Sequence, residues 1–424
     1  MDKNKIQLKD KIGLKAPYGV WGELPIAYLG TTLTCKAGVG SLLLRATLRS
    51  VCTAMRRFAP VSDADSRHHS VQPVPYVRAG AKSKTLKKIS HAILISLFLF
   101  LFTYAETSIL GTAESLLVRQ EYDSARSVVD AVLKQAPEDN YALYLKIAIE
   151  QTEILDYESY LVRNAAFIAL ADSVMTVLEN RLPALRGKDS VACLFYVGNI
   201  HGGISVLQAK VGAWFPALNS ALTSVNMLKE VARVDSSLNA ALLGIGVFNY
   251  YLSKSFKWLP LINADSEKEG VRMIEKAAAA AFPYNYAAKN SLCWILIERK
   301  KYGRADSIAR TVLCTNPNNT IFLRIRTLIA LWSGNDSAAV KLGERLGNIA
   351  LVRKPVNWSD LVAAHYVVAA GYDALGRGTE ALAAADEVAG KKIPAQFKQI
   401  PHIKKNLRKI QAIRKKYRPG PKKR

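Results

Sequence analysis

Apolar residues recur at steps of three and four through most of the chain from residue 107 to residue 390. This spacing is typical of one face of an α-helix. Prolines, glycines and short polar runs interrupt it and predict the turns. Between residues 140 and 281, helices are predicted at 140–153, 159–181, 189–209, 213–232, 238–254 and 266–281. We therefore expect an all-α fold.

One helix-turn-helix pattern appears twice at an offset of 180 residues. The windows 121–139, EYDSARSVVDAVLKQAPED, and 301–319, KYGRADSIARTVLCTNPNN, each follow an amphipathic segment and a short polar turn. The shared positions are Tyr122 with Tyr302, Ala125 with Ala305, and Pro137 with Pro317. A small residue lets two helices cross closely, and proline cannot continue a helix. Each window is therefore predicted to be the second helix of a pair.

Two further copies extend the pattern toward the C-terminus. Ala338 lies 33 residues after Ala305, and a later segment carries Tyr372, Gly376 and Ala381 in the same order. These units resemble the tetratricopeptide repeat, whose period is 34 residues. The clearest units are predicted at 107–138, 285–318, 319–350 and 359–390, with a longer loop, RKPVNW, before the last. The resemblance implies a right-handed α-solenoid of about seven helix pairs with a concave groove that binds peptide segments.

The segment 241–261, ALLGIGVFNYYLSKSFKWLPL, is similar to a family of tetratricopeptide proteins that is associated with the mitochondrial outer membrane and with the clearance of inclusions. That family also has bacterial relatives. Its aromatic residues suit either core packing or a peptide-binding surface. Adjacent tyrosines cannot both face one core, so we expect at least one to reach the groove or the surface. The candidate groove contacts are Tyr250, Tyr251, Phe256, Trp258 and His201.

Charge is concentrated at the two ends of the chain. The formal net charge is +25, yet residues 91–390 hold equal numbers of basic and acidic side chains. Residues 391–424 hold 14 basic residues and no acidic one. A nucleic-acid-binding domain usually carries its basic surface on the fold itself, so the neutral body disfavours a nucleic-acid partner.

The segment 391–424 is predicted to form a basic helix and tail. Its apolar stripe consists of Ile403, Leu407, Ile410, Ile413 and Tyr417. One interpretation is a capping helix that covers the last repeat. The other is a helix attracted to an anionic membrane surface. The candidate contacts for that surface are Lys404, Lys405, Arg408, Lys409, Lys415 and Lys416.

An export signal is predicted at 81–105, where four lysines precede an apolar run that ends before Ala105. Cleavage after Ala105 would leave a repeat domain at 106–390. An uncleaved segment would anchor the protein in a membrane. Residues 1–80 have the composition of an unstructured region, and we interpret them as an N-terminal extension or an over-extended reading frame.

Motifs for catalysis, cofactors or metals are missing from the sequence. It contains no HExxH, no GxSxG and no phosphate-binding GxxxxGK[ST], and its five cysteines form no CxxC pair. We therefore expect no enzyme, cofactor or metal. The predicted function is a scaffold of the cell envelope that binds a protein or peptide in its groove. The alternative is a membrane-peripheral assembly protein held by its basic C-terminal helix. A homo-oligomer is left open.

Overall fold

The computed structural model describes residues 109–255, 264–280 and 285–418. These residues all belong to one compact unit of the chain. The predicted N-terminal extension and export signal lie outside the described residues, as do Phe256 and Trp258.

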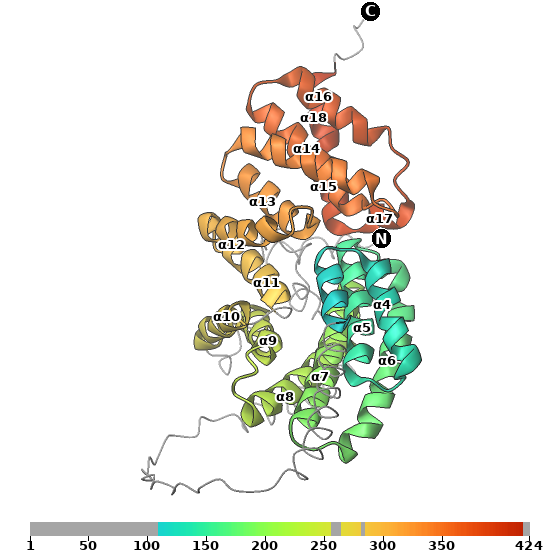
Figure 1. The fold of residues 1–424 in the computed structure, drawn as a ribbon. Coiled ribbons are helices and arrows are strands. Elements are labelled where there is room, and N and C mark those ends of the chain that lie inside the picture. The colour runs from blue at the N-terminus through green and yellow to red at the C-terminus, as the bar shows by residue number, and fades with distance from the viewer. Residues whose placement is uncertain (1–108, 256–263, 281–284, 419–424) are drawn as a thin grey trace, which may run out of the picture. The chain divides into compact units, whose positions relative to one another are not determined.

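Seven consecutive helix pairs make up the described unit (Figure 1). We number them in chain order. Pairs 1 to 4 are the helix Ile109–Val118 with α4 (Tyr122–Gln135), α5 (Asn140–Asp156) with α6 (Tyr160–Arg181), α7 (Gly187–Lys210) with α8 (Trp214–Val234), and α9 (Ala241–Ser255) with α10 (Ala264–Ala278). Pairs 5 to 7 are α11 (Asn285–Glu298) with α12 (Tyr302–Thr315), α13 (Thr320–Trp332) with α14 (Asp336–Val352), and α15 (Trp358–Ala374) with α16 (Gly378–Ala389). The short helices η1 (Leu182–Ala184) and α17 (Ala395–Gln399) and the final α18 (Pro401–Tyr417) complete the unit. The predicted all-α repeat solenoid is confirmed.

The first helices of neighbouring pairs pack against one another. Contacts join α5 to α7, α7 to α9, α11 to α13, and α13 to α15, while in pairs 2 to 7 the first helix also packs on the second helix of its own pair. Stacking of this kind places the first helices along one face of a solenoid. Residues that stay partly exposed on the first helices therefore form a shared surface.

The turn inside each pair depends on one residue with left-handed backbone geometry. In six pairs a residue with positive φ lies two positions before the second helix. These residues are Gln120, Glu158, Gly212, Lys300, Gly334 and Gly376, with φ between 53° and 86°. Glycine adopts this conformation without steric cost, whereas other residues are strained. Three of the six turns therefore carry a non-glycine residue against its backbone preference.

Small side chains allow the two helices of a pair to approach closely. The fourth residue of the second helix is a buried alanine in five pairs: Ala125, Ala217, Ala305, Ala339 and Ala381. The prediction of Ala338 for this position is wrong. Because α14 begins at Asp336, the regular spacing of 34 residues from Ala305 leads to Ala339, and Ala338 is only partly buried.

The remaining repeat positions have clear local roles. Helix α4 ends at Gln135 and α12 at Thr315, two residues before Pro137 and Pro317 respectively. Tyr122 is buried, Tyr302 is partly buried, and the Tyr372 hydroxyl donates a hydrogen bond of 3.0 Å to Glu344.

Helices α9 and α10 cross more closely than ordinary side chains permit. A Cβ atom added to Gly246 would lie 2.7 Å from the Gly270 carbonyl oxygen, and one added to Gly270 would lie 2.7 Å from the Gly246 carbonyl oxygen. The GIG sequence at 244–246 therefore serves helix packing.

Two segments, 160–184 and 187–210, are long and apolar enough to cross a membrane. They form α6 with η1, and α7. About half of the apolar stretch of the second is buried within the repeats, against 28% of the first. Both carry core residues such as Phe167 and Ile200, so their apolar composition is at least partly explained by packing.

The stripe of α18 packs on the last pair. Ile403, Ile410 and Ile413 are buried, and the helix contacts both α15 and α16. Arg414 and Arg418 form ion pairs with Asp386 of α16. This is the arrangement that the capping interpretation predicts.

We expect Gly334→Ala to lower the free energy of unfolding by about 1 kcal/mol, because an L residue is strained at φ of 75°. Nothing lies within 4 Å of the added Cβ, so packing does not contribute.

Lys300→Gly should raise the free energy of unfolding by about 0.5 kcal/mol, since relief of strain exceeds the added chain entropy. Chemical denaturation measures both values.

Gly303→Ala is the matched control, because Gly303 is helical and its added Cβ also meets nothing within 4 Å. It should be neutral or stabilising. A loss of stability equal to that of Gly334→Ala would contradict the role of the turn geometry.

Candidate functional site

Two of the predicted aromatic groove contacts, Tyr250 and Tyr251, are not at the surface. Tyr250 and Tyr251 are both buried, so the expectation that at least one reaches the groove or surface is wrong. Helix α9 contacts α7, α8 and α10, so side chains that point in different directions can both be buried. The Tyr250 hydroxyl donates to Glu298 at 2.8 Å, and its ring meets that of Tyr251 edge-on. Burial raises the pKa of Tyr250 to about 12.

His201 is partly buried in α7 and faces α6. Its Nε2 atom lies 3.9 Å from Oε1 of Glu179. Burial lowers the pKa of the His201 imidazole, and the carboxylates of Glu179 and Asp172 act against this shift. Sequence spacing alone does not bring Glu179 to this histidine. No group of three or more metal-ligating side chains is present in the part of the chain that the structure describes.

A different group of aromatic residues, partly exposed, lies on the first helices. Tyr141 and Tyr144 of α5 and Tyr196 of α7 are each partly exposed, and their rings stack with interplanar angles of 16° to 26°. Ring centroids are 4.9 Å apart between Tyr144 and Tyr196. We call these three residues the tyrosine triad. Phe195 is buried beside it and contacts two of the rings.

The triad ends at a buried carboxyl group. The Tyr141 hydroxyl donates a hydrogen bond to Glu114 of the first helix. Burial raises the pKa of Glu114 to about 7. The triad therefore links the first helices of pairs 1, 2 and 3.

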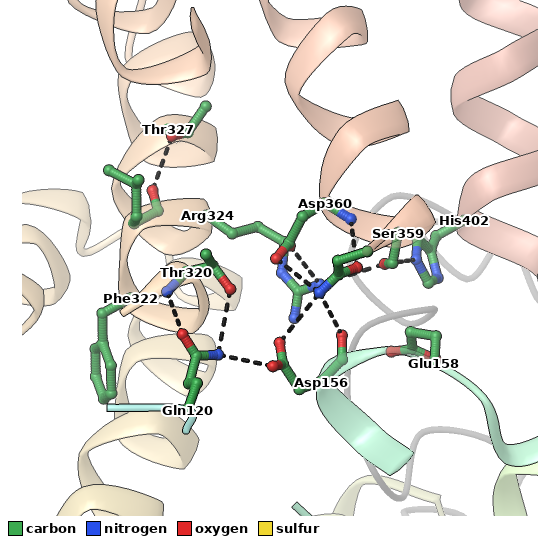
Figure 2. Close-up of polar contacts among 12 residues, drawn as sticks. Gln120, Asp156, Glu158, Thr320, Phe322, Arg324, Thr327, Ser359, Asp360 and His402 are labelled. Carbon is green, nitrogen blue, oxygen red and sulfur yellow. Dashed lines mark hydrogen bonds and ion pairs between the residues drawn. The ribbon is translucent and has the colours of Figure 1, made fainter. Parts of the chain in front are cut away.

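A buried polar arrangement is centred on Asp156, at the end of α5 (Figure 2). Its Oδ2 atom accepts hydrogen bonds of 2.8 Å from Gln120 and from the Tyr122 hydroxyl. Arg353 forms an ion pair with the same oxygen at 2.7 Å. Asn357 donates to the Asp156 backbone carbonyl and to its Oδ1 atom. Residues about 200 positions apart in the sequence thus share one site.

Arg353 is also held by aromatic rings. Its guanidinium carbon lies 4.4 Å from the ring centroid of Tyr157 and 5.7 Å from that of Tyr122. Burial alone would lower the pKa of Arg353, but the neighbouring Asp156 raises it above its usual value. The arginine is therefore charged in the folded protein.

A second ion pair continues the network into pair 7. Arg324 lies 3.1 Å from Asp360, whose side chain is fully buried. Asn357 joins the two carboxylates, because its amide donates to Asp156 and, at 3.0 Å, to Asp360. Ser359 contacts Arg324 at 3.3 Å and His402 of α18 at 3.0 Å. We call the region around Asp156 and Asp360 the polar junction.

The polar junction has the composition of a structural site. It holds two aspartates and two arginines, so its charges balance. A serine beside a histidine is a pairing that nucleophilic catalysis uses, but Ser359 is only 1% exposed and a substrate cannot reach it. No sequence pattern predicts the junction, although the RKPVNW loop before the last repeat supplies both Arg353 and Asn357.

The described structure defines a class of protein. Paired helices, a left-handed turn residue, buried alanines and the 34-residue spacing of pairs 5 and 6 are those of a tetratricopeptide-like repeat protein. No protein-family model matches the chain, and no curated protein matches it.

Solved structures of low sequence identity are similar to the chain. One is the C-terminal part of a TPR repeat-containing protein from Cytophaga hutchinsonii, at 16% identity and a TM-score of 0.36, covering 70% of this chain and 99% of that one. Another is a tetratricopeptide repeat protein from Parabacteroides merdae ATCC 43184, at 10% identity and a TM-score of 0.35, covering 72% and 98% respectively.

The junction predicts an unusual pH dependence. Burial raises the pKa of Asp360 to about 6, Arg324 acts to lower it, and Asp156 adds to the rise. Between the ordinary aspartate pKa near 3.9 and about 6, the folded state binds more protons at this group than the unfolded state. The contribution of Asp360 to stability is therefore present at low pH and lost as pH rises through about 6. Asp360→Asn should remove that slope, measured as the difference in Tm from wild type between pH 4.5 and pH 7.

Asp373→Asn provides a control without this slope. Hydrogen bonds from Lys416 and Tyr417 lower the pKa of Asp373, so its contribution is complete above the ordinary aspartate pKa near 3.9 and is lost only as pH falls below it. The difference in Tm between Asp373→Asn and wild type should therefore stay nearly constant between pH 4.5 and pH 7, and an equal slope in both variants would contradict the assignment of a raised pKa to Asp360.

Proposed function

We propose that this protein is a non-enzymatic scaffold that binds a protein or peptide segment on the face formed by its first helices. The tyrosine triad is the observation that supports this proposal. Tyrosine offers a large, rigid apolar ring with a polar end, and such residues often dominate protein interfaces. Three partly exposed rings lie on two neighbouring first helices, where a partner would contact both.

The proposal includes a place in the cell envelope. Its support is the predicted export signal at 81–105, with a basic segment, an apolar run and small residues before Glu106. Under this proposal the repeat domain acts after export, or from a membrane anchor if the signal is not cleaved.

A photo-crosslinking amino acid tests the partner surface. We expect p-benzoylphenylalanine in place of Tyr144 or Tyr196 to form a discrete adduct in the native cells, because the partner would contact these rings. Thr176, an exposed residue of the second helix α6, is the control position and should form none. Mass spectrometry identifies the adduct. Equal labelling at Thr176, or no adduct at either tyrosine, would contradict the proposal.

Attachment to an anionic membrane surface is a second candidate function, favoured by the arrangement of α18. Packing uses its apolar stripe, so the helix cannot insert that stripe into lipid. Its outer side presents the exposed cations Lys404, Arg408 and Lys415. Lys409 instead donates a hydrogen bond to the Tyr366 hydroxyl, and Lys416 forms an ion pair with Asp373. Binding would therefore be electrostatic and sensitive to salt.

The triple variant Lys404→Gln, Arg408→Gln and Lys415→Gln should weaken binding to vesicles containing phosphatidylglycerol by about 100-fold or more, at about 1 kcal/mol per cation. Vesicle co-sedimentation at low salt measures this. The control exchanges Lys134, Lys188 and Lys276, three exposed lysines elsewhere, for glutamine. Equal weakening in both variants would show that only the net charge matters.

A further inference from the structure

Two contacts of the same design join the first pairs to the last. Asn319 and Asn357 precede α13 and α15 and cap them, accepting hydrogen bonds from Phe322 and Asp360 backbone amides. The side-chain amide of Asn319 donates to the Val118 carbonyl at 2.7 Å. That of Asn357 donates to the Asp156 carbonyl at 3.2 Å. Each capping amide thus binds a turn carbonyl 201 residues earlier.

The two contacts are in register with the repeats. Val118 and Asp156 each lie two positions before a left-handed turn residue, Gln120 and Glu158. Successive pairs 1 and 2 therefore dock by equivalent turn atoms on the successive helix starts of pairs 6 and 7. We call this two-point arrangement the clasp.

Gln120 reinforces the clasp at its first point. Its Oε1 atom accepts a hydrogen bond of 2.7 Å from the backbone amide of Thr320, the first residue of α13. The first amides of a helix have no acceptor within the helix. Gln120 supplies one from pair 1, while its Nε2 atom contacts Asp156 and the Thr320 hydroxyl. Arg353 also reaches the Thr320 hydroxyl, at 3.3 Å, and so ties the two points together.

At this interface the apolar contacts favour association, and the polar contacts select the alignment. One buried apolar cluster contains residues of α5 to α7 together with residues of α15 and α18, and its burial favours association. The buried ion pairs add little net stability, because desolvation offsets their attraction. Polar groups that are satisfied in only one alignment instead select that alignment, since any slip would leave them buried and unpaired.

We propose that the clasp fixes the register in which pairs 1 and 2 meet pairs 6 and 7, and thereby sets the curvature of the first-helix face between them. The last clause rests on the proposed function, because that face is where the partner would bind. The register itself is independent of any partner and is testable on the free protein.

The test uses a substitution that keeps the helix cap and breaks the clasp. Asn319→Asp retains an oxygen for the Phe322 amide, and aspartate caps helices as well as asparagine does. It replaces the donor to Val118 with an oxygen, which the carbonyl repels. Asn335→Asp is the matched control, because Asn335 caps α14 through Ala338 without a contact in the clasp. The double variant Asn319→Asp, Asn357→Asp breaks both points.

Hydrogen exchange at the Thr320 amide reports on the clasp directly. We expect it to be about tenfold faster in Asn319→Asp, as for the loss of a single hydrogen bond, with the interior amides of α13 unchanged. Asn335→Asp should leave the Thr320 rate at the wild-type value. Should the double variant fail to fold, the single variant still gives this measurement.

Spin labels at Ser124 and Lys341 measure the register. Both positions are exposed, on α4 and α14. Cys314→Ser removes the exposed thiol among the described residues, and Cys35→Ser and Cys52→Ser remove the two thiols that lie outside them. We expect a narrow distance distribution in wild type and a broader or shifted one in the double variant. Wild-type exchange at Thr320 together with an unchanged distribution would overturn the proposal. A doubled mass in light scattering of the wild type would also overturn it, as evidence for a clasp formed between two chains.

Loss of the clasp and failure of the partner site are distinguishable. The exchange and distance measurements need no partner, whereas the crosslinking at Tyr144 does. A confirmed clasp with no adduct at the triad would leave the register established and remove only its consequence for binding.

Discussion

The buried ion pair between Asp156 and Arg353 is the constraint that the surrounding polar contacts must satisfy. It joins the end of α5 to the loop between pairs 6 and 7, where the Asp156 side chain is fully buried and that of Arg353 is 12% exposed. An isolated charge in such a place would cost several kcal/mol, so each ion requires the other. The hydrogen bonds of Gln120, Tyr122 and Asn357 to Asp156 follow from the same requirement, since a buried carboxylate must be satisfied on all sides.

Local sequence predicts the local structure well. The helix expected at 189–209 is α7, Gly187–Lys210, and that at 159–181 is α6, Tyr160–Arg181. Helical periodicity, turn residues and proline positions act over a few residues, so one sequence contains all the information they need. Even here a shift of one residue matters, because Ala338 and Ala339 face different surroundings on the same helix.

The candidate site could not be predicted in the same way. Asp156 of pair 2 and Asn357 at the start of pair 7 meet only through the stacking of the pairs between them, and no sequence pattern near either residue indicates that contact. The burial of both Tyr250 and Tyr251 has a similar cause, since α9 has neighbours on several sides. The tyrosine triad could be predicted in part, because Tyr141 and Tyr144 are three residues apart on a predicted helix. Tyr196 joins them only through the packing of α5 on α7.

The left-handed turn residues indicate where side chains are needed. Glycine is the unstrained choice at all six turns, yet Gln120 and Glu158 stand at two of them. Gln120 belongs to the clasp, and Glu158 forms a buried ion pair of 3.0 Å with Lys210 of the next pair. At both sites a contact to another pair outweighs the backbone strain. At two of the three turns without glycine the side chain thus joins one repeat to another, and a comparison of the turns within one amino-acid sequence would select such positions for inspection.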